Sequence, residues 1–137
     1  IKQINISFNE LSKTLRGFHY QIKPSLEKKI ISCIAGSVHN IVVDLRKNSL
    51  TFLKWQSFIL SESNKISLVL PEGCANAFIT TSNKTKVLYF HSEFYEAEHS
   101  KSFYYKDPYF NFDWPYAPDI ISQKDKTAPL FSQIAEE

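Results

Sequence analysis

Short β-forming runs recur along this chain at a spacing of roughly ten residues, with turn-forming residues between them. The runs that we expect as strands are residues 30–34, 38–45, 50–60, 66–70, 75–81 and 86–90. Glycine or proline stands in several of the turns, as in the segment 71–73 (PEG). We expect the first two runs to form a hairpin that bends at Gly36. This regular spacing predicts an all-β sandwich or barrel.

The chain changes character after His91, where aromatic residues and prolines replace the alternating strands. The pairs Asp107-Pro108 and Trp114-Pro115 require extended or turn geometry. Residues 122–137 are the one helical candidate, as a short C-terminal helix after Pro129. The 137 residues carry no repeat, linker or low-complexity segment, and a chain of this length fills one core. We therefore expect one domain over residues 1–137.

Composition and charge exclude several classes of protein. The formal net charge is only +2 and no cluster of Lys and Arg concentrates it, so we expect no nucleic-acid partner. No run approaches the ~18–20 apolar residues of a membrane span, and the first residues do not resemble a signal peptide. We expect a cytoplasmic protein without a membrane partner. Aromatic residues make up 15% of the chain, and such residues often line small-molecule pockets.

Two cysteines, Cys33 and Cys74, each lie inside an apolar run. They could pair, but two isolated buried thiols are the favoured interpretation, because nothing else indicates a disulfide framework. The sequence also lacks C-x-x-C, His-x-His and His-x-x-x-His spacings. Since a metal site needs several convergent N, O or S donors, we expect no dedicated metal centre.

The histidines are the first candidates for proton transfer near neutral pH. On a strand, His19 and Gln21 would lie on one face, and Phe18 and Tyr20 on the other. Arg16 on the same strand would bring a cation to the cavity that His19 faces. A structural histidine remains the alternative for His19, and structural or exposed positions are favoured for the others, namely His39, His91 and His99.

Several motifs follow one another along nearly the whole chain. Residues 3–7 have the pattern Q-x-N-x-S, residues 14–21 read TLRGFHYQ, and Lys29 stands seven residues before Gly36. The later segments are 43–46 (VDLR), 49–52 (SLTF), 70–78 (LPEGCANAF), Leu88-Tyr89, Tyr95, Asp107-Pro108, Trp114-Pro115 and 122–125 (SQKD). In this order and spacing they are similar to the dTDP-4-dehydrorhamnose 3,5-epimerase family.

The resemblance implies a cupin-type jelly-roll β-sandwich, a homodimer, and chemistry without metal or cofactor. The implied substrate is a nucleotide-linked 4-keto-6-deoxy sugar, epimerised at C3 and/or C5 through an enolate. His19 would be the base, oriented by Asp125, and Lys29 would stabilise charge on the C4 oxygen. Tyr89 would return the proton from the other face of the sugar.

The resemblance also implies a set of substrate-binding residues. Arg16 would hold the diphosphate, for which a guanidinium is well suited, and Tyr95 would line the sugar or nucleotide pocket. The complete set expected to bind substrate is Arg16, Gln21, Gln3, Asn5, Asn76 and Tyr95.

Each of these residues also has a simpler interpretation. Lys29 could be a solvated charge beside Lys28, Tyr89 a core aromatic residue, and Asp125 a surface loop residue. For the nearby Asp44 and Arg46 we favour a structural ion pair over catalysis.

The chain departs from the family pattern at three places. Asn76 stands where the family has a pocket histidine, and asparagine cannot carry a proton at neutral pH. The family also carries a further segment before the Q-x-N motif that contributes to the nucleotide site. We therefore expect weaker binding of the nucleotide, or a substrate that carries a different nucleotide. Lys126 follows Asp125 where the family has arginine. A catalytically silent sugar-nucleotide-binding or assembly subunit is therefore the alternative function, and an unrelated isomerase of the same fold is a third.

Overall fold

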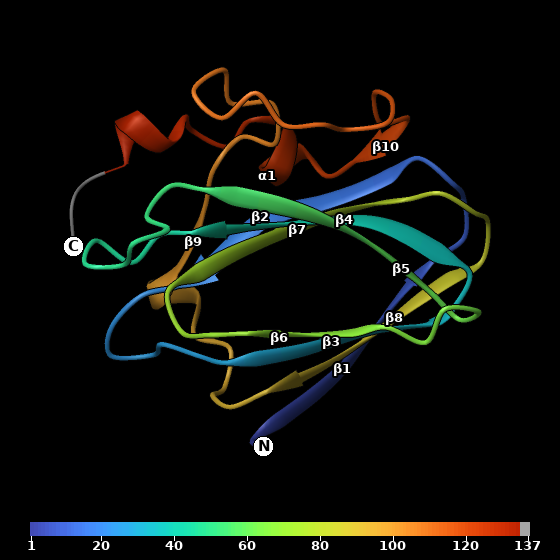
Figure 1. The fold of residues 1–137 in the computed structure, drawn as a ribbon, viewed down its shortest axis with the longest axis horizontal. Coiled ribbons are helices and arrows are strands. Elements are labelled where there is room, and N and C mark those ends of the chain that lie inside the picture. The colour runs from blue at the N-terminus through green and yellow to red at the C-terminus, as the bar shows by residue number, and fades with distance from the viewer. Residues whose placement is uncertain (135–137) are drawn as a thin grey trace.

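A computed structural model describes residues 1–134 as two facing β-sheets (Figure 1). The four-stranded sheet has the order β1 (Gln3–Asn9), β8 (Thr85–His91), β3 (Lys29–Ala35) and β6 (Ser67–Leu70). The six-stranded sheet has the order β10 (Ile120–Ile121), β2 (Thr14–Gln21), β7 (Cys74–Thr80), β4 (Ser37–Asp44) and β5 (Trp55–Ser61), and β9 (Ser100–Ser102) also pairs with β2. This confirms the predicted jelly-roll β-sandwich.

The predicted hairpin at Gly36 is wrong. Strand β3 pairs with β6 and β8 in one sheet, whereas β4 pairs with β5 and β7 in the other. Gly36 has a φ of +76°, and a Cβ there would meet the hydroxyl of Thr85 at 2.4 Å. The chain therefore turns a corner between two sheets at this glycine, which lets Ile31 and Val38 pack into one core from opposite sides.

Smaller differences concern the ends of elements. The strand expected from residue 50 begins at Trp55, because residues 50–53 form a turn. The helix α1 (Gln123–Lys126) lies before Pro129 rather than after it, and a 3₁₀-helix follows at Phe131–Gln133. Residues 135–137 of the expected helix lie outside the described residues.

Two hydrophobic clusters hold the sandwich together. One fills the space between the sheets and contains Ile31, Phe78 and Val87. The other lies on the outer face of the six-stranded sheet, where Phe18 stacks on Phe103 with ring centroids 4.6 Å apart. The C-terminal aromatic segment covers this second cluster, as the orange and red chain above the upper sheet shows (Figure 1). Cys33 is buried and Cys74 half-buried, and the two thiols are unpaired, as predicted.

Asp44 closes the turn that follows β4. Its carboxylate accepts hydrogen bonds from Arg46 (Nε at 2.9 Å) and from the Ser49 and Thr51 hydroxyls, which confirms the expected structural ion pair. The Arg46 guanidinium and these two hydroxyls outweigh the opposing effect of burial and hold the pKa of Asp44 well below its usual range.

We expect Asp44→Asn to lower the free energy of unfolding by about 1–3 kcal/mol at neutral pH, since the donors of Arg46, Ser49 and Thr51 lose a charged acceptor. Because the pKa is depressed in the folded state, this stabilisation is present above pH ~4 and declines as the pH falls below that value. Urea unfolding at pH 7 and pH 3 checks this, with Glu10→Gln at an exposed position as the control. Equal losses for Asp44→Asn at both pH values would contradict the electrostatic origin.

Candidate active site

A cavity of about 520 Å³ opens between the two sheets, a size suited to a small-molecule ligand. Its lining comes from β1, β2, β3, β7, β8, α1 and neighbouring loops. The residues predicted from the sequence for catalysis or binding all line it, namely Gln3, Asn5, Arg16, His19, Gln21, Lys29, Asn76, Tyr89, Tyr95 and Asp125. Residues from distant parts of the chain thus meet at one site.

His19 and Asp125 form a hydrogen-bonded pair in this cavity, with His19 Nε2 2.7 Å from Asp125 Oδ1. The Ser122 hydroxyl caps α1 by accepting from the Asp125 amide, and the Gly17 amide donates to Asp125 Oδ2 at 3.2 Å. Burial alone would raise the pKa of Asp125, but the hydrogen bond and charge of His19 outweigh it and hold the pKa below its usual value. Asp125 is therefore an ionised, buried carboxylate rather than a surface loop residue.

Gly17 permits the close contact between β2 and β7 behind this pair. It has a φ of +114°, and a Cβ there would lie 2.6 Å from the Asn76 carbonyl oxygen and 2.7 Å from the Ala77 Cβ. A larger residue would push β2 away from β7. Because Gly17 also donates to Asp125, this glycine links the sheet to the orientation of His19.

Tyr89 lies on β8, in the sheet opposite to the one that carries His19. Burial raises the pKa of its phenol, and the charge of Arg16 only partly opposes this. The phenol therefore keeps its proton at neutral pH and is available as a donor to a bound molecule. The His19 imidazole and the Tyr89 phenol thus lie on different walls of one cavity.

Three cationic side chains line the same cavity: Arg16, Lys29 and Lys124. Arg16 is oriented by Asn9, whose Oδ1 accepts from the guanidinium Nε at 2.7 Å. Lys29 is not the solvated charge that its neighbour Lys28 suggested, because only 12% of its side chain is exposed. Such a set of cations can hold a diphosphate and stabilise a developing oxyanion.

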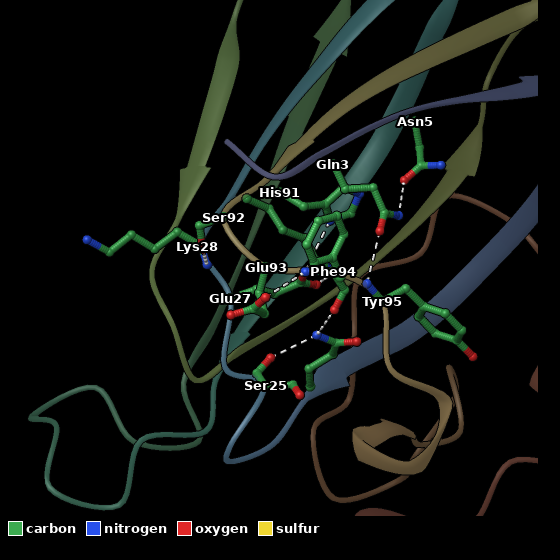
Figure 2. Close-up of polar contacts among 12 residues, drawn as sticks. Gln3, Asn5, Ser25, Glu27, Lys28, His91, Ser92, Glu93, Phe94 and Tyr95 are labelled. Atoms are coloured by element: carbon green, nitrogen blue, oxygen red, sulfur yellow. Dashed lines mark hydrogen bonds and ion pairs between the residues drawn. The ribbon is translucent and has the colours of Figure 1, made fainter.

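The polar residues at the rim of the cavity are linked to one another (Figure 2). The Gln3 amide donates to Asn5 Oδ1 at 2.6 Å and accepts from the Tyr95 backbone amide at 3.0 Å. Gln21 donates to the Ser25 and Phe94 carbonyls and accepts from the Glu96 amide. The part of Gln21 in substrate binding stays a prediction, since its amide already holds two loops together.

The sequence also matches the model of a known protein family. The model described as dTDP-4-dehydrorhamnose 3,5-epimerase matches residues 1–133. The chain belongs to the dTDP-4-dehydrorhamnose 3,5-epimerase family. The motifs that resembled this family in the sequence therefore identified it correctly.

Curated relatives carry the same family name. The chain is 37% identical over 117 residues to a dTDP-4-dehydrorhamnose 3,5-epimerase of Shigella flexneri, covering 85% of this chain and 65% of that protein. It is 31% identical over 137 residues to the enzyme of that name from Mycobacterium tuberculosis, covering 98% of this chain and 67% of that protein. The chain thus spans about two thirds of the length of these relatives.

Solved epimerases share the fold closely. The dTDP-4-dehydrorhamnose 3,5-epimerase of Bacillus anthracis, with TDP and PPi bound, matches with a TM-score of 0.91 and 37% identity, over 93% of this chain and 73% of that one. A dTDP-6-deoxy-D-glucose-3,5-epimerase of Legionella pneumophila, in complex with dTDP-4-keto-L-rhamnose, matches with a TM-score of 0.91 and 35% identity, over 97% and 70%. The described residues contain no helix that is long and apolar enough to cross a membrane.

Asn76, where the family resemblance led us to expect a histidine, lies beside His19 on the adjacent strand. Asn76 is 5% exposed, and its Oδ1 has no hydrogen-bond partner among the described residues. This wall of the cavity therefore carries a neutral amide, which cannot exchange a proton at neutral pH.

Some cavity residues were missed in the sequence. Ser7, Ser122 and Lys124 lie inside motifs of the epimerase family, so their positions in those motifs could have indicated them. Glu27 and His91 belong to no motif, and nothing in the local sequence pattern points to them.

We expect Asp125→Asn to reduce turnover of the epimerase by about 10²–10⁴-fold while the protein stays folded. An amide is a weaker partner than a carboxylate for a protonated His19 ring, and it can favour the wrong tautomer of that ring. Steady-state kinetics, with circular dichroism to monitor folding, measure the effect. Activity within threefold of the wild type would exclude Asp125 from the reaction.

Proposed function

We propose that this protein is an epimerase that inverts C3 and/or C5 of a nucleotide-linked 4-keto-6-deoxy sugar. The observation that supports this best is the His19–Asp125 pair on one wall of the cavity, with the Tyr89 phenol on the opposite sheet. Inversion of a carbon next to a ketone requires a base on one face and an acid on the other. The cytoplasmic location expected from the sequence is part of this proposal.

In the proposed first step, His19 removes the proton from the carbon next to the C4 ketone. Its Nε2 faces Asp125, and a carboxylate only accepts hydrogen bonds, so Nε2 carries the ring hydrogen. Nδ1 is then the basic nitrogen, and Asp125 stabilises the imidazolium that results.

In the second step, the electrons of the broken C–H bond move into an enolate whose oxygen is the former ketone oxygen. The Lys29 ammonium stabilises this negative charge. The Tyr89 phenol then donates its proton to the opposite face of the same carbon, which inverts the centre. Exchange with solvent returns a proton to Tyr89 and removes one from His19. The reaction moves only protons, so it needs no redox cofactor.

Incubation with a dTDP-linked 4-keto-6-deoxy sugar in D₂O tests the proposal. We expect deuterium to appear at C3, at C5 or at both, as followed by proton NMR. Parallel reactions with guanosine and cytidine diphosphate carriers would identify the nucleotide. Failure of well-folded protein to exchange either position with any carrier would contradict the epimerase function.

The second candidate is a subunit that binds a sugar nucleotide without catalysis. Asn76 favours it, because a neutral amide stands beside the proposed base in place of a titratable ring. Calorimetric binding of the sugar nucleotide in the absence of any deuterium exchange would support this candidate over the epimerase.

We also propose a homodimer that forms through the outer face of the four-stranded sheet. On β1 the usual alternation is inverted, because Gln3, Asn5 and Ser7 line the cavity while the apolar residues point outward. The outward residues Ile4, Ile6 and Phe8 are 57%, 59% and 52% exposed. In Figure 1 no layer of the described chain covers this lower face, and an exposed apolar sheet face of this kind favours a second copy as its partner.

Ile6→Lys should therefore convert the dimer into monomers, as measured by sedimentation velocity. Leu50→Lys is the matched control, since Leu50 is an apolar residue that is 98% exposed in a turn. A wild-type protein that sediments as a monomer would exclude the dimer.

A further inference from the structure

A buried cluster of three titratable residues lies beside the cavity, and the proposed mechanism uses only one of them. Glu27 Oε1 lies 3.3 Å from the Lys29 Nζ, and Glu27 Oε2 lies 3.2 Å from His91 Nδ1. The side chains of Glu27, Lys29 and His91 are only 8%, 12% and 14% exposed. All three line the cavity.

The hydrogen bonds of the cluster have a defined direction. A carboxylate has no hydrogen to donate, so His91 Nδ1 donates to Glu27 Oε2, while the Lys29 ammonium forms an ion pair with the other carboxylate oxygen. Both carboxylate oxygens of Glu27 are thus engaged by different partners. The side chain cannot rotate without breaking a buried, charge-assisted contact.

The backbone around the cluster is held in place from both sides. Lys29 and His91 are register partners on β3 and β8, and the segment before β3 is tied to the segment after β8 by Lys28 and Ser92. The Lys28 amide donates to the Ser92 hydroxyl at 2.7 Å, and the Ser92 amide donates to the Lys28 carbonyl at 3.0 Å. Figure 2 shows Glu27 and His91 meeting next to this contact.

The cluster also touches the proposed acid. The His91 ring stacks on the Tyr89 ring with centroids 5.8 Å apart and an interplanar angle of 17°. Glu27 and His91 therefore lie next to the proposed charge-stabilising residue, and His91 also packs against the proposed proton donor. Neither has another role in the site described above.

We propose that Glu27 and His91 are positioning residues of the epimerase, which together hold the Lys29 ammonium where the enolate oxygen forms. This inference rests on the proposed function. A lysine side chain is flexible, and stabilisation of a transition state depends on charge that is in place before the reaction. Lys29 has three N–H donors, so the ion pair with Glu27 can hold the ammonium in place while N–H donors remain for substrate.

The first test compares matched carboxylate variants. Glu27→Gln is expected to lower kcat about 10–100-fold with KM changed less than about threefold. The reason is that a misplaced Lys29 ammonium weakens stabilisation of the transition state more than it weakens binding of the substrate. Glu93→Gln is the control, since Glu93 pairs with Lys2 at a more exposed position of the same edge. Equal kinetics for the two variants, with wild-type protein active, would overturn the inference.

Two variants of His91 separate its hydrogen bond from its ring. His91→Asn keeps an N–H donor near the position of Nδ1 and loses the ring, whereas His91→Phe keeps the stacked ring and loses the donor. If His91 acts through Glu27, His91→Asn should retain most of kcat and His91→Phe should resemble Glu27→Gln. The reverse order would show that packing on Tyr89, rather than positioning of Lys29, explains the effect.

A second readout does not depend on activity. Competitive labelling of lysines with acetic anhydride, quantified by mass spectrometry, should show Lys29 labelled several-fold faster in Glu27→Gln and His91→Phe, and unchanged in Glu93→Gln and His91→Asn. Equal Lys29 labelling in all variants would show that the pair does not hold the ammonium. A wild-type protein that exchanges no deuterium would refute the epimerase function and the catalytic part of this inference. The lysine labelling would still decide, in that case, whether Glu27 and His91 hold Lys29.

Discussion

Replacing His19 by alanine is expected to abolish deuterium exchange at both carbons next to the ketone, with a loss of about 10²–10⁴-fold in rate. The reason is that His19 is the base in the proposed mechanism, and its partner Asp125 is held in place by α1 and by Gly17. The measurement is proton NMR of the sugar in D₂O over hours.

The chain contains a matched control for this experiment. His39 also pairs with an aspartate, since its Nε2 lies 3.1 Å from Asp113 Oδ1, but it packs against Trp114 and does not line the cavity. His39→Ala therefore removes a His–Asp pair of similar geometry and should leave exchange within a few fold of the wild type. Exchange that survives in His19→Ala, in a protein that still binds the sugar nucleotide by calorimetry, would refute His19 as the base.

In Tyr89→Phe, deuterium exchange at the carbon next to the ketone should continue while inversion of that carbon is lost. His19 in this variant can still remove a proton and return a deuteron to the same face, but no acid remains on the opposite face. We expect deuterium to enter the starting sugar, while formation of the inverted product falls about 10²–10⁴-fold. Phenylalanine keeps the ring against His91 and removes only the hydroxyl.

The two products distinguish the outcomes of this experiment. Proton coupling constants of the sugar ring report the configuration, and the loss of a signal reports exchange at that carbon. Inversion at the wild-type rate in Tyr89→Phe would show that another group donates the proton. A loss of both exchange and inversion would show that the hydroxyl is needed already for removal of the proton.

Much of the fold and most of the site could be predicted from the sequence, because the signals were local or were carried by motifs. The strands β6, β7 and β8 follow from short β-forming runs between turns. Residues as far apart as Gln3 and Asp125 were predicted to share a site on the strength of motifs alone, and they do line one cavity.

The failures have a physical cause in common. The two strands joined at Gly36 could either pair with each other or enter opposite sheets. The outcome depends on the strands with which they pair elsewhere in the chain, and the residues of the turn do not specify those partners. Strand β1 is a separate case, because Ile4, Ile6 and Phe8 alternate with polar residues and this local pattern could have indicated a strand. Glu27 and His91 were missed because they meet only when β3 pairs with β8.

The placement of His19 and Tyr89 on different sheets has a further consequence. No single strand sets the distance between these two groups, so this distance is determined by the thickness of the layer between the sheets, which Ile31 and Phe78 help to fill. In the proposed mechanism, the core of this protein therefore sets the distance between base and acid as well as stabilising the fold. Volume changes at buried positions that never touch the sugar should alter which of its carbons can fit between base and acid, and with it the stereochemistry of the product.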